Sequence, residues 1–263
     1  ITWNTLINGY SELGYGEESL NCYEMMRVEG VSPTVVTYVC TLKACCNIGA
    51  IDKGNEIHSE IEKNSLLESD LFVANTLIDM YAKFEMFTKA REVFNKLPVR
   101  DVVSWNALIS GYVEHGLAEE ALDYFNQMQV DGIPPNAVTF TCAMKACGNI
   151  GAVAIAKCQN LHAEIEMNGM LKTSQNVGNA LVDMYAKCGS LEKAKEVFDL
   201  LPVRDIVSWN ALICGCVQHE QGEEALNQFK KMQLQGISGD DVTYACILKA
   251  CGCIRSTNKG EEI

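Results

Sequence analysis

The stretch Ser104-Trp-Asn-Ala-Leu-Ile-Ser-Gly-Tyr112 decides the fold, because the chain spells it three times. The other copies run from Thr2 to Tyr10 and from Ser208 to Cys216. Apolar residues at the second, fifth and sixth places of each copy share one helical face, so the stretch predicts an amphipathic helix. The Ser or Thr that opens each copy is predicted to cap that helix.

An asparagine stands at the third place of every copy, off the apolar face. For a single copy, local capping or simple solvation would explain such a residue as readily as a function would. Three copies, at Asn4, Asn106 and Asn210, shift this balance. A unit that recurs is one supersecondary element, and a polar residue held at one phase lines one face of the stack.

Alignment on these asparagines predicts eight repeats in a cycle of three unlike kinds. Each repeat is about 31 to 38 residues long, which suits a helix–turn–helix, and no lasting strand alternation competes. The predicted class is therefore all-α, with stacked helix pairs in one tract over residues 1–263. The repeats are 1–34, 35–70, 71–101, 102–136, 137–174, 175–205, 206–240 and a truncated 241–263.

The composition of the 263 residues narrows the class further. The hydrophobic fraction of 48% supplies a continuous core, and no run of 18 apolar residues predicts a membrane span. Because the sequence opens and closes inside a repeat, we expect a fragment of a longer protein. The missing targeting segment then says nothing about location.

Thirteen cysteines raise the question of a metal or disulfide scaffold. Six of them recur at two fixed repeat phases, as Cys45, Cys147 and Cys251 do. Such placement is typical of small buried apolar residues. No pair has zinc-knuckle spacing, so no metal or other cofactor is predicted, and many free thiols indicate a reducing compartment.

The two shortest complete repeats, 71–101 and 175–205, differ at the start of their second helix. Ser190, after Gly189, is predicted to cap it, whereas Glu85 and Met86 stand at these places in the third repeat. That helix is expected to begin less well, by about 1 kcal/mol.

These motifs resemble pentatricopeptide repeat proteins, in particular the plant subclass in which P, L and S repeats alternate. VVSWNALISGY with EEALDYFNQM is similar to a P repeat, and VTYVCTLKACCNIGAIDKGNEIH to an L repeat. VGNALVDMYAKCGSLEKAKEVFDLLPVRD is similar to an S repeat. The resemblance implies a right-handed α-solenoid that binds single-stranded RNA in mitochondria or chloroplasts, at about one nucleotide per repeat.

In the family, the fifth and last residues of a repeat read the base and the second residue wedges against it. Carried over, the resemblance implies that the bases are read by Asn4, Thr34, Asn75, Asp101, Asn106, Asn136, Thr141, Ser174, Asn179, Asp205, Asn210 and Asp240. It implies stacking by Ile1, Val36, Phe72, Val103, Val138, Val207 and Val242, and phosphate contacts by Lys83 and Lys187. Asn176 departs from the apolar wedge pattern.

The Asn–Asp combinations of the third, sixth and seventh repeats imply uracil. Asn106 with Asn136 implies a pyrimidine, and Thr141 with Ser174 implies a weak purine preference. The first repeat implies a pyrimidine, and the second repeat implies no choice of base. An alternative role remains for Asp101 and Asp205. Each precedes a first helix, where a carboxylate stabilises the helix dipole.

The net charge of −13 runs against RNA binding. Most carboxylates of the P repeats fall on the predicted second helices, away from the reading face. We therefore expect modest affinity with a shallow salt dependence, and we expect Lys83 and Lys187 either to contact phosphates or to be merely solvated.

The leading hypothesis is the specificity tract of an organellar C-to-U RNA-editing factor. The sequence lacks a His-x-Glu with a Cys-x-x-Cys partner, so no enzyme activity is expected and a cytidine deaminase would lie elsewhere. The alternative is a protein-interaction scaffold that binds a small editing-accessory protein or a partner helix. Apolar ends could also pair two copies into a dimer, and no membrane is expected.

Overall fold

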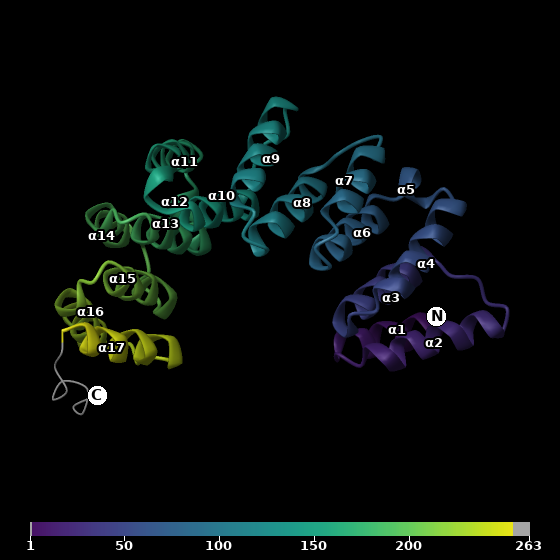
Figure 1. Ribbon diagram of the computed structural model, residues 1–263, viewed down its shortest axis with the longest axis horizontal. Coiled ribbons are helices and arrows are strands. Elements are labelled where there is room, and N and C mark those ends of the chain that lie inside the picture. The colour runs from purple at the N-terminus through teal and green to yellow at the C-terminus, as the bar shows by residue number, and fades with distance from the viewer. Residues whose placement is uncertain (1, 255–263) are drawn as a thin grey trace. The chain divides into compact units, whose positions relative to one another are not determined.

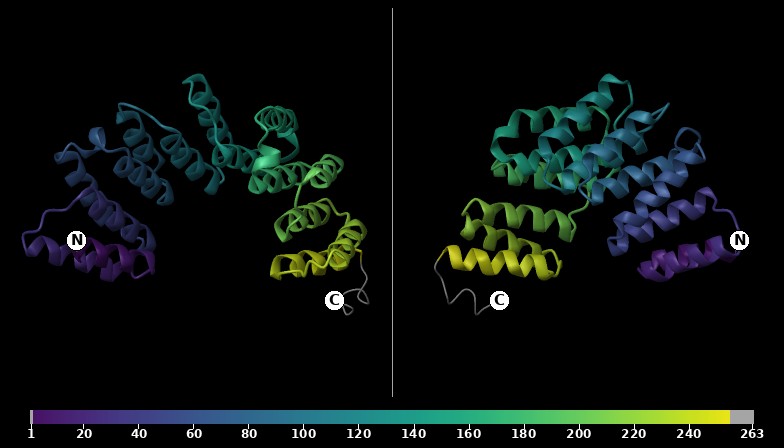
Figure 2. Two further views of the ribbon diagram at one scale, coloured as in Figure 1. Left: turned by 180° about the vertical axis from the view of Figure 1, so that it is seen from behind. Right: turned by 45° about the vertical axis from the view of Figure 1, so that its right-hand side comes forward.

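The computed structural model describes residues 2–254, and every element in that range is helical (Figure 1). The prediction of an all-α class is confirmed. Figure 2 shows the helix pairs from two further sides. The helices are α1 (Thr2–Glu12), α2 (Gly16–Val28), α3 (Val35–Ile48), α4 (Ile51–Lys63), α5 (Leu66–Ser69), α6 (Leu71–Lys83), α7 (Phe87–Lys96), α8 (Val102–Glu114), α9 (Ala118–Val130), α10 (Ala137–Ile150), η1 (Gly151–Ala154), α11 (Ile155–Met167), α12 (Met170–Thr173), α13 (Gln175–Lys187), α14 (Leu191–Leu200), α15 (Ile206–Gln218), α16 (Gly222–Leu234) and α17 (Asp241–Cys253).

The chain forms two compact units. The first comprises Ile1–His115 and Asn126–Pro134, and the second comprises Gly116–Phe125 and Pro135–Ile263. In the first unit the helices α1, α3, α6 and α8 pack in succession, and in the second unit α10, α13, α15 and α17 do so. These are the first helices of the predicted repeats, so each unit carries a row of them.

The residue that ends a repeat starts the next first helix. The Asp101 carboxylate accepts the Ser104 N–H at 2.8 Å, and the Asp205 carboxylate accepts the Ser208 N–H at 2.9 Å. The prediction that Ser104 and Ser208 are the caps was wrong, because each lies one turn inside a helix that an aspartate caps. Side-chain caps of this kind are made by Thr34, Asp70, Asp101, Asn136, Asp205 and Asp240.

Aromatic and glycine residues of the repeated stretch fix how closely the helices pack. Trp105 and Trp209 are buried, and each ring stands edge-on to a phenylalanine of the preceding second helix, Phe94 or Phe198. A Cβ at Gly111 would collide with the Ala82 side chain, and a Cβ at Gly215 would collide with Ala186. Glycine therefore permits close approach of neighbouring first helices.

The cysteines mostly pack as predicted, with one exception. Cys45, Cys147 and Cys251 are buried thiols. The expectation of free thiols throughout was wrong for Cys214 and Cys246, which form a disulfide between α15 and α17 with Cα atoms 5.6 Å apart. The two residues come from different repeats, so spacing within one helix could not reveal the pair.

Residues 137–167 are long and apolar enough, by length and composition, to cross a membrane. The sequence predicts no span by the criterion of 18 uninterrupted apolar residues, which this segment does not meet. The segment is not one straight helix. Gly151, at φ +80°, ends α10, and after η1 the chain continues as α11, which packs against α10. Half of the apolar window is buried, as the core of a helix pair would be.

The third and sixth repeats differ at the start of the second helix, as predicted, but for a reason other than the predicted cap. Ser190 makes no capping hydrogen bond to α14, so the prediction that it caps this helix was wrong. Met86 likewise makes no side-chain cap for α7. The contrast lies one residue earlier, where Gly189 has φ +79° and Glu85 has φ +57°. Only glycine adopts this backbone region without strain.

Candidate nucleic-acid interface

The first helices of each unit carry the amide and carboxylate groups predicted to read bases. In the sixth repeat the Asn179 amide nitrogen donates to both carboxylate oxygens of Asp205, at 3.1 and 3.0 Å. In the third repeat the Asn75 amide donates to the Asp101 carboxylate. Asn75 on α6 is only 8% exposed, and Asn179 on α13 is only 6% exposed. The structure thus joins the fifth and last residues of both repeats at the edge between adjacent first helices.

The P repeats build a related arrangement with a third member. Asn210 donates to Asp240 at 2.9 Å and accepts the Thr243 hydroxyl at 2.5 Å. Asn4 donates to Thr34 at 3.1 Å and accepts the Thr37 hydroxyl at 2.6 Å. Sequence reasoning missed these threonines. Their signal was available, because a threonine recurs at the third residue of each L repeat.

The fourth and fifth repeats are less uniform. Asn106 lies half-buried on α8 in the first unit, whereas Asn136 lies in the second, where it accepts the Val138 and Thr139 N–H groups at 3.0 Å. In the fifth repeat the Thr141 hydroxyl donates to the Ala137 carbonyl at 2.8 Å. Ser174 makes no side-chain cap. No hydrogen bond between the described Thr141 and Ser174 side chains brings this predicted pair together.

Apolar side chains at the second residue of the repeats are exposed, although their type favours burial. Each stands in the first turn of a first helix, beside the capping residue. Ile1 lies outside the described residues, and Asn176, which breaks the apolar pattern, is also exposed. The exposed wedge residues are Val36, Phe72, Val103, Val138, Val207 and Val242.

The carboxylates at this edge stay ionised well into acid. Burial by itself raises the pKa of Asp205, but hydrogen bonds from the Ser208 N–H and the Asn179 amide outweigh it and hold the pKa below its usual value. The pKa of Asp101 is lowered in the same way, with Ser104 and Asn75 as the donors against burial. Each carboxylate therefore acts as a charged acceptor that orients its amide.

The two lysines predicted to contact phosphates each pair with an aspartate of their own helix. The Lys83 ammonium lies 2.9 Å from Asp79, and the Lys187 ammonium lies 2.7 Å from Asp183. Each pair has no net charge. The positive field that these lysines offer to a phosphate is consequently small.

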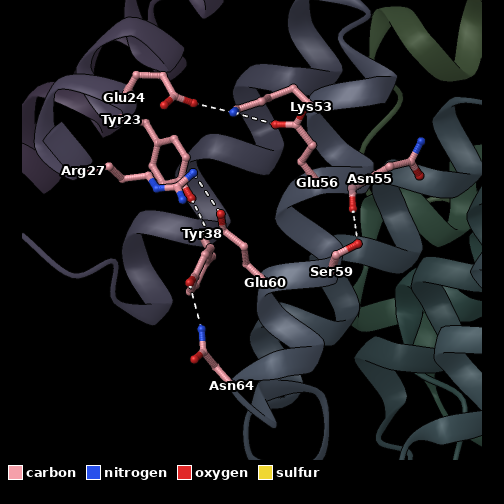
Figure 3. Close-up of polar contacts among 10 residues, drawn as sticks. All are labelled: Tyr23, Glu24, Arg27, Tyr38, Lys53, Asn55, Glu56, Ser59, Glu60 and Asn64. Carbon is pink, nitrogen blue, oxygen red and sulfur yellow. Dashed lines mark hydrogen bonds and ion pairs between the residues drawn. The ribbon is translucent and has the colours of Figure 1, made fainter.

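The second helices carry a separate polar layer (Figure 3). Glu60 of α4 accepts the Tyr23 hydroxyl at 2.9 Å and pairs with Arg27 of α2 at 2.9 Å. Lys53 bridges Glu24 and Glu56. Arg27 and Lys53 are thereby paired with carboxylates within the protein, so they contribute little positive field elsewhere.

A base edge could use this first-helix row in a simple way. An amide offers a donor and an acceptor to a Watson–Crick edge, and an adjacent carboxylate sets which of the two faces outward. An exposed apolar side chain one turn away supplies a surface for the base plane. The arrangement suits the recognition of flat, polar-edged groups one at a time.

Comparison with known sequences now settles the family. The profile of the PPR repeat family matches residues 1–47, 100–149 and 204–253, which together exceed half of the chain. The PPR repeat profile matches residues 72–102 and 179–206. This chain belongs to the pentatricopeptide repeat family. The family assignment predicted from the sequence motifs is confirmed.

Individual relatives agree with this assignment. A chloroplastic pentatricopeptide repeat-containing protein of Arabidopsis thaliana is 37% identical over 97% of this chain and 40% of its own length. A mitochondrial one, named as putative, is 36% identical over all of this chain and 41% of its own length. The chain therefore spans well under half of these two curated relatives.

Among solved structures, the chain resembles the pentatricopeptide repeat protein PPR10 in complex with an 18-nt psaJ RNA element. The TM-score is 0.64 at 18% identity, over 99% of this chain and 44% of PPR10. At this identity the likeness establishes the fold alone. The α-solenoid class that the family resemblance implies is confirmed.

Proposed function

We propose that this chain is a sequence-selective tract for single-stranded RNA, with P, L and S repeats at the boundaries predicted from the sequence. The observation that carries the proposal is the edge of amide–carboxylate pairs along the first helices, flanked by exposed apolar wedges. PPR10, which shares the fold, is described in complex with RNA. In this proposal each repeat takes one nucleotide, read by its fifth and last residues.

The proposed role is the specificity tract of an organellar C-to-U RNA-editing factor. Family membership and the chloroplastic and mitochondrial relatives support an organellar RNA target. The deaminase, or an accessory protein that supports editing, would act from outside this tract. The proposed target carries uracil opposite the third, sixth and seventh repeats.

A binding titration tests the proposal directly. The probe is a seven-nucleotide RNA, flanked by a fixed sequence, with uracil at its third, sixth and seventh places. Its competitor carries purines at those places. The proposal expects tighter binding of the uracil probe by about tenfold or more, since three positions lose matched hydrogen bonds. Equal affinity for the two probes, or no binding at low salt, would refute it.

A change of preference at one repeat locates the reading amide. Asn210→Thr keeps Asp240, and the family pattern for Thr with Asp implies guanine. The preference at the seventh nucleotide should move from uracil toward guanine, while the preference at the third nucleotide stays unchanged. An unaltered seventh position would exclude Asn210 as a reader.

A second candidate function, a protein-interaction scaffold, is favoured by one observation. The second helices begin with exposed carboxylates, among them Glu17, Glu18, Glu119, Glu120 and Glu223, and the net charge is −13. Within either unit, carboxylates of this kind suit a basic partner helix. Replacing these five with Gln should abolish partner binding and leave RNA selectivity intact. If the unsubstituted chain binds no basic helix, RNA binding alone is favoured.

A further inference from the structure

The third and sixth repeats have the same predicted reading pair but differently occupied amides. Asn75 and Asn179 each donate to an aspartate. The side-chain oxygen of Asn75, Oδ1, is buried and has no hydrogen-bond partner within the protein. The side-chain oxygen of Asn179, Oδ1, accepts a hydrogen bond from the side-chain amide of Gln175 at 3.1 Å. The difference comes from the first residue of each repeat, which is Leu71 in one and Gln175 in the other.

Gln175 is held in place from two sides. Its amide nitrogen donates to the Asn179 oxygen and, at 2.7 Å, to the Val203 carbonyl in the loop before Asp205. An amide nitrogen carries two hydrogens, so both are used. The Asn179 amide is then engaged at its nitrogen and at its oxygen. Leu71 has no polar atom with which to do the same for Asn75.

An unpartnered buried carbonyl oxygen is unfavourable in the free protein, and a ligand that donates to it removes that penalty. Uracil presents an N3–H donor at the centre of its Watson–Crick edge, whereas cytosine presents an N3 lone pair at the same place. A base that reaches the unpartnered Asn75 side-chain oxygen should therefore bind more tightly as uracil than as cytosine. Asn179 gains less from the same donor, because its oxygen is already satisfied.

We infer that Gln175 is a specificity-determining residue that weakens the uracil-over-cytosine preference of the sixth repeat. The inference rests on the proposed RNA-binding function. It assigns a role to the first residue of a repeat, outside the fifth and last residues that define the reading pair. The sixth nucleotide is then a tolerant position and the third a stringent one.

The comparison of uracil with cytosine isolates this effect from stacking. The wedge is Phe72 in the third repeat and Asn176 in the sixth, so the two repeats stack bases differently. Stacking depends weakly on base identity, and the two pyrimidines have the same ring size. The affinity ratio at one position therefore reports hydrogen bonding, whereas absolute affinity reports both.

The test exchanges the two first residues in the 263-residue chain. Gln175→Leu should raise the uracil-to-cytosine affinity ratio at the sixth nucleotide by about two- to tenfold, the effect of one neutral hydrogen bond. Leu71→Gln should lower the ratio at the third nucleotide by a similar factor. The probes are RNA pairs that differ from uracil to cytosine at only one of these places.

Two controls keep the outcomes separate. Gln175→Met removes the donor with an unbranched side chain, and it should match Gln175→Leu if the hydrogen bond is responsible. Thermal unfolding of each variant checks that the fold persists. A fall in the sixth-position ratio, or no change in either repeat, would overturn the role of Gln175 while leaving RNA binding in place. If the unsubstituted chain binds no RNA, the proposed function itself fails.

Discussion

The α1–α3 pair of the first unit and the α15–α17 pair of the second occupy the same places in their repeats, but they carry different residues at matching positions. Where α1 faces α3, the Cys40 thiol donates to the side-chain oxygen of Asn8 at 3.1 Å. Where α15 faces α17, the corresponding residues are Cys214 and Cys246, and they form a disulfide. Similar contrasts separate Leu71 from Gln175 and Glu85 from Gly189. A repeat therefore fixes where two side chains meet, and the individual residues decide what they do there.

The disulfide gives the largest expected difference between the units. Cys214→Ser should lower the free energy of unfolding of the oxidised protein by about 3–4 kcal/mol, because the bond closes a loop over a sequence separation of 32. In excess reductant the same substitution should have little effect. Urea unfolding with and without reductant measures both values.

The first unit supplies the control for that substitution. Cys40→Ser removes a buried thiol at the same phase but breaks no covalent bond, so its effect should not depend on reductant. Asn8→Cys gives the first unit the residue pair of the second, and oxidation should then link it to Cys40. Mass analysis that finds both thiols still free after oxidation would show that the phases are not equivalent.

The amide–carboxylate edge should give the next largest effect. Asp205→Ala removes the cap of α15 and leaves the buried Asn179 amide without its acceptor, for a loss of about 2 kcal/mol. Asp101→Ala should cost a similar amount in the first unit. A loss below about 0.5 kcal/mol for both would mean that these carboxylates stabilise little and serve mainly the ligand.

Because of these same carboxylates, the free energy of unfolding is expected to fall in acid. The folded-state pKa values of Asp101 and Asp205 lie below their ordinary values. Their contribution is therefore complete above about pH 4–5 and is lost as the pH falls through the folded-state values. Asp205→Asn should flatten the part of the stability–pH curve that Asp205 supplies. An unchanged curve would assign the acid transition to other groups.

Much of this structure could be predicted from sequence, because the fold repeats. The helical phase of Trp105, the class and the family all follow from a pattern that occurs three times. Asp101 and Asp205 could be foreseen both as groups that stabilise a helix start and as members of base-reading pairs. The structure shows the first role and the contact of each carboxylate with its amide, whereas base reading remains a proposal.

What the sequence did not reveal depends on contacts between repeats. Thr243 reaches Asn210 from the next repeat, and Cys214 meets Cys246 across two first helices. A periodic pattern orders residues within one helix, but it does not state which residues of neighbouring helices lie opposite. The cap was misplaced onto Ser104 for a local reason, since an aspartate three residues earlier offers the better acceptor.

Glu85 should give a smaller, stabilising effect. Its φ of +57° is unfavourable for a residue with a Cβ, so Glu85→Gly is expected to raise the free energy of unfolding by about 1 kcal/mol. Gly189→Ala is the matched change in the second unit. There φ is +79° and a Cβ would lie 3.2 Å from the His219 ring, so stability should fall. Urea midpoints that move in the same direction for both would contradict the strain argument.

The lysines should give the smallest effect on stability and a measurable one on salt dependence. Asp79→Asn frees Lys83 from a partner on an exposed helix face, and such pairs contribute less than about 0.5 kcal/mol. If the freed ammonium contacts a phosphate, the slope of log affinity against log salt steepens by about 0.7. Asp183→Asn should do less, because the Lys187 side chain is 34% exposed against 50% for Lys83.

A second-helix lysine distinguishes a phosphate contact from a general charge effect. Glu62→Gln frees Lys96 of α7 and changes the net charge by the same amount as Asp79→Asn. Because Lys96 lies on a second helix, away from the row of amides, its release should leave the salt slope unchanged. Equal slopes for the two variants would mean that RNA responds only to total charge. A steeper slope for Asp79→Asn alone would place the RNA backbone beside the first helices, within reach of Lys83.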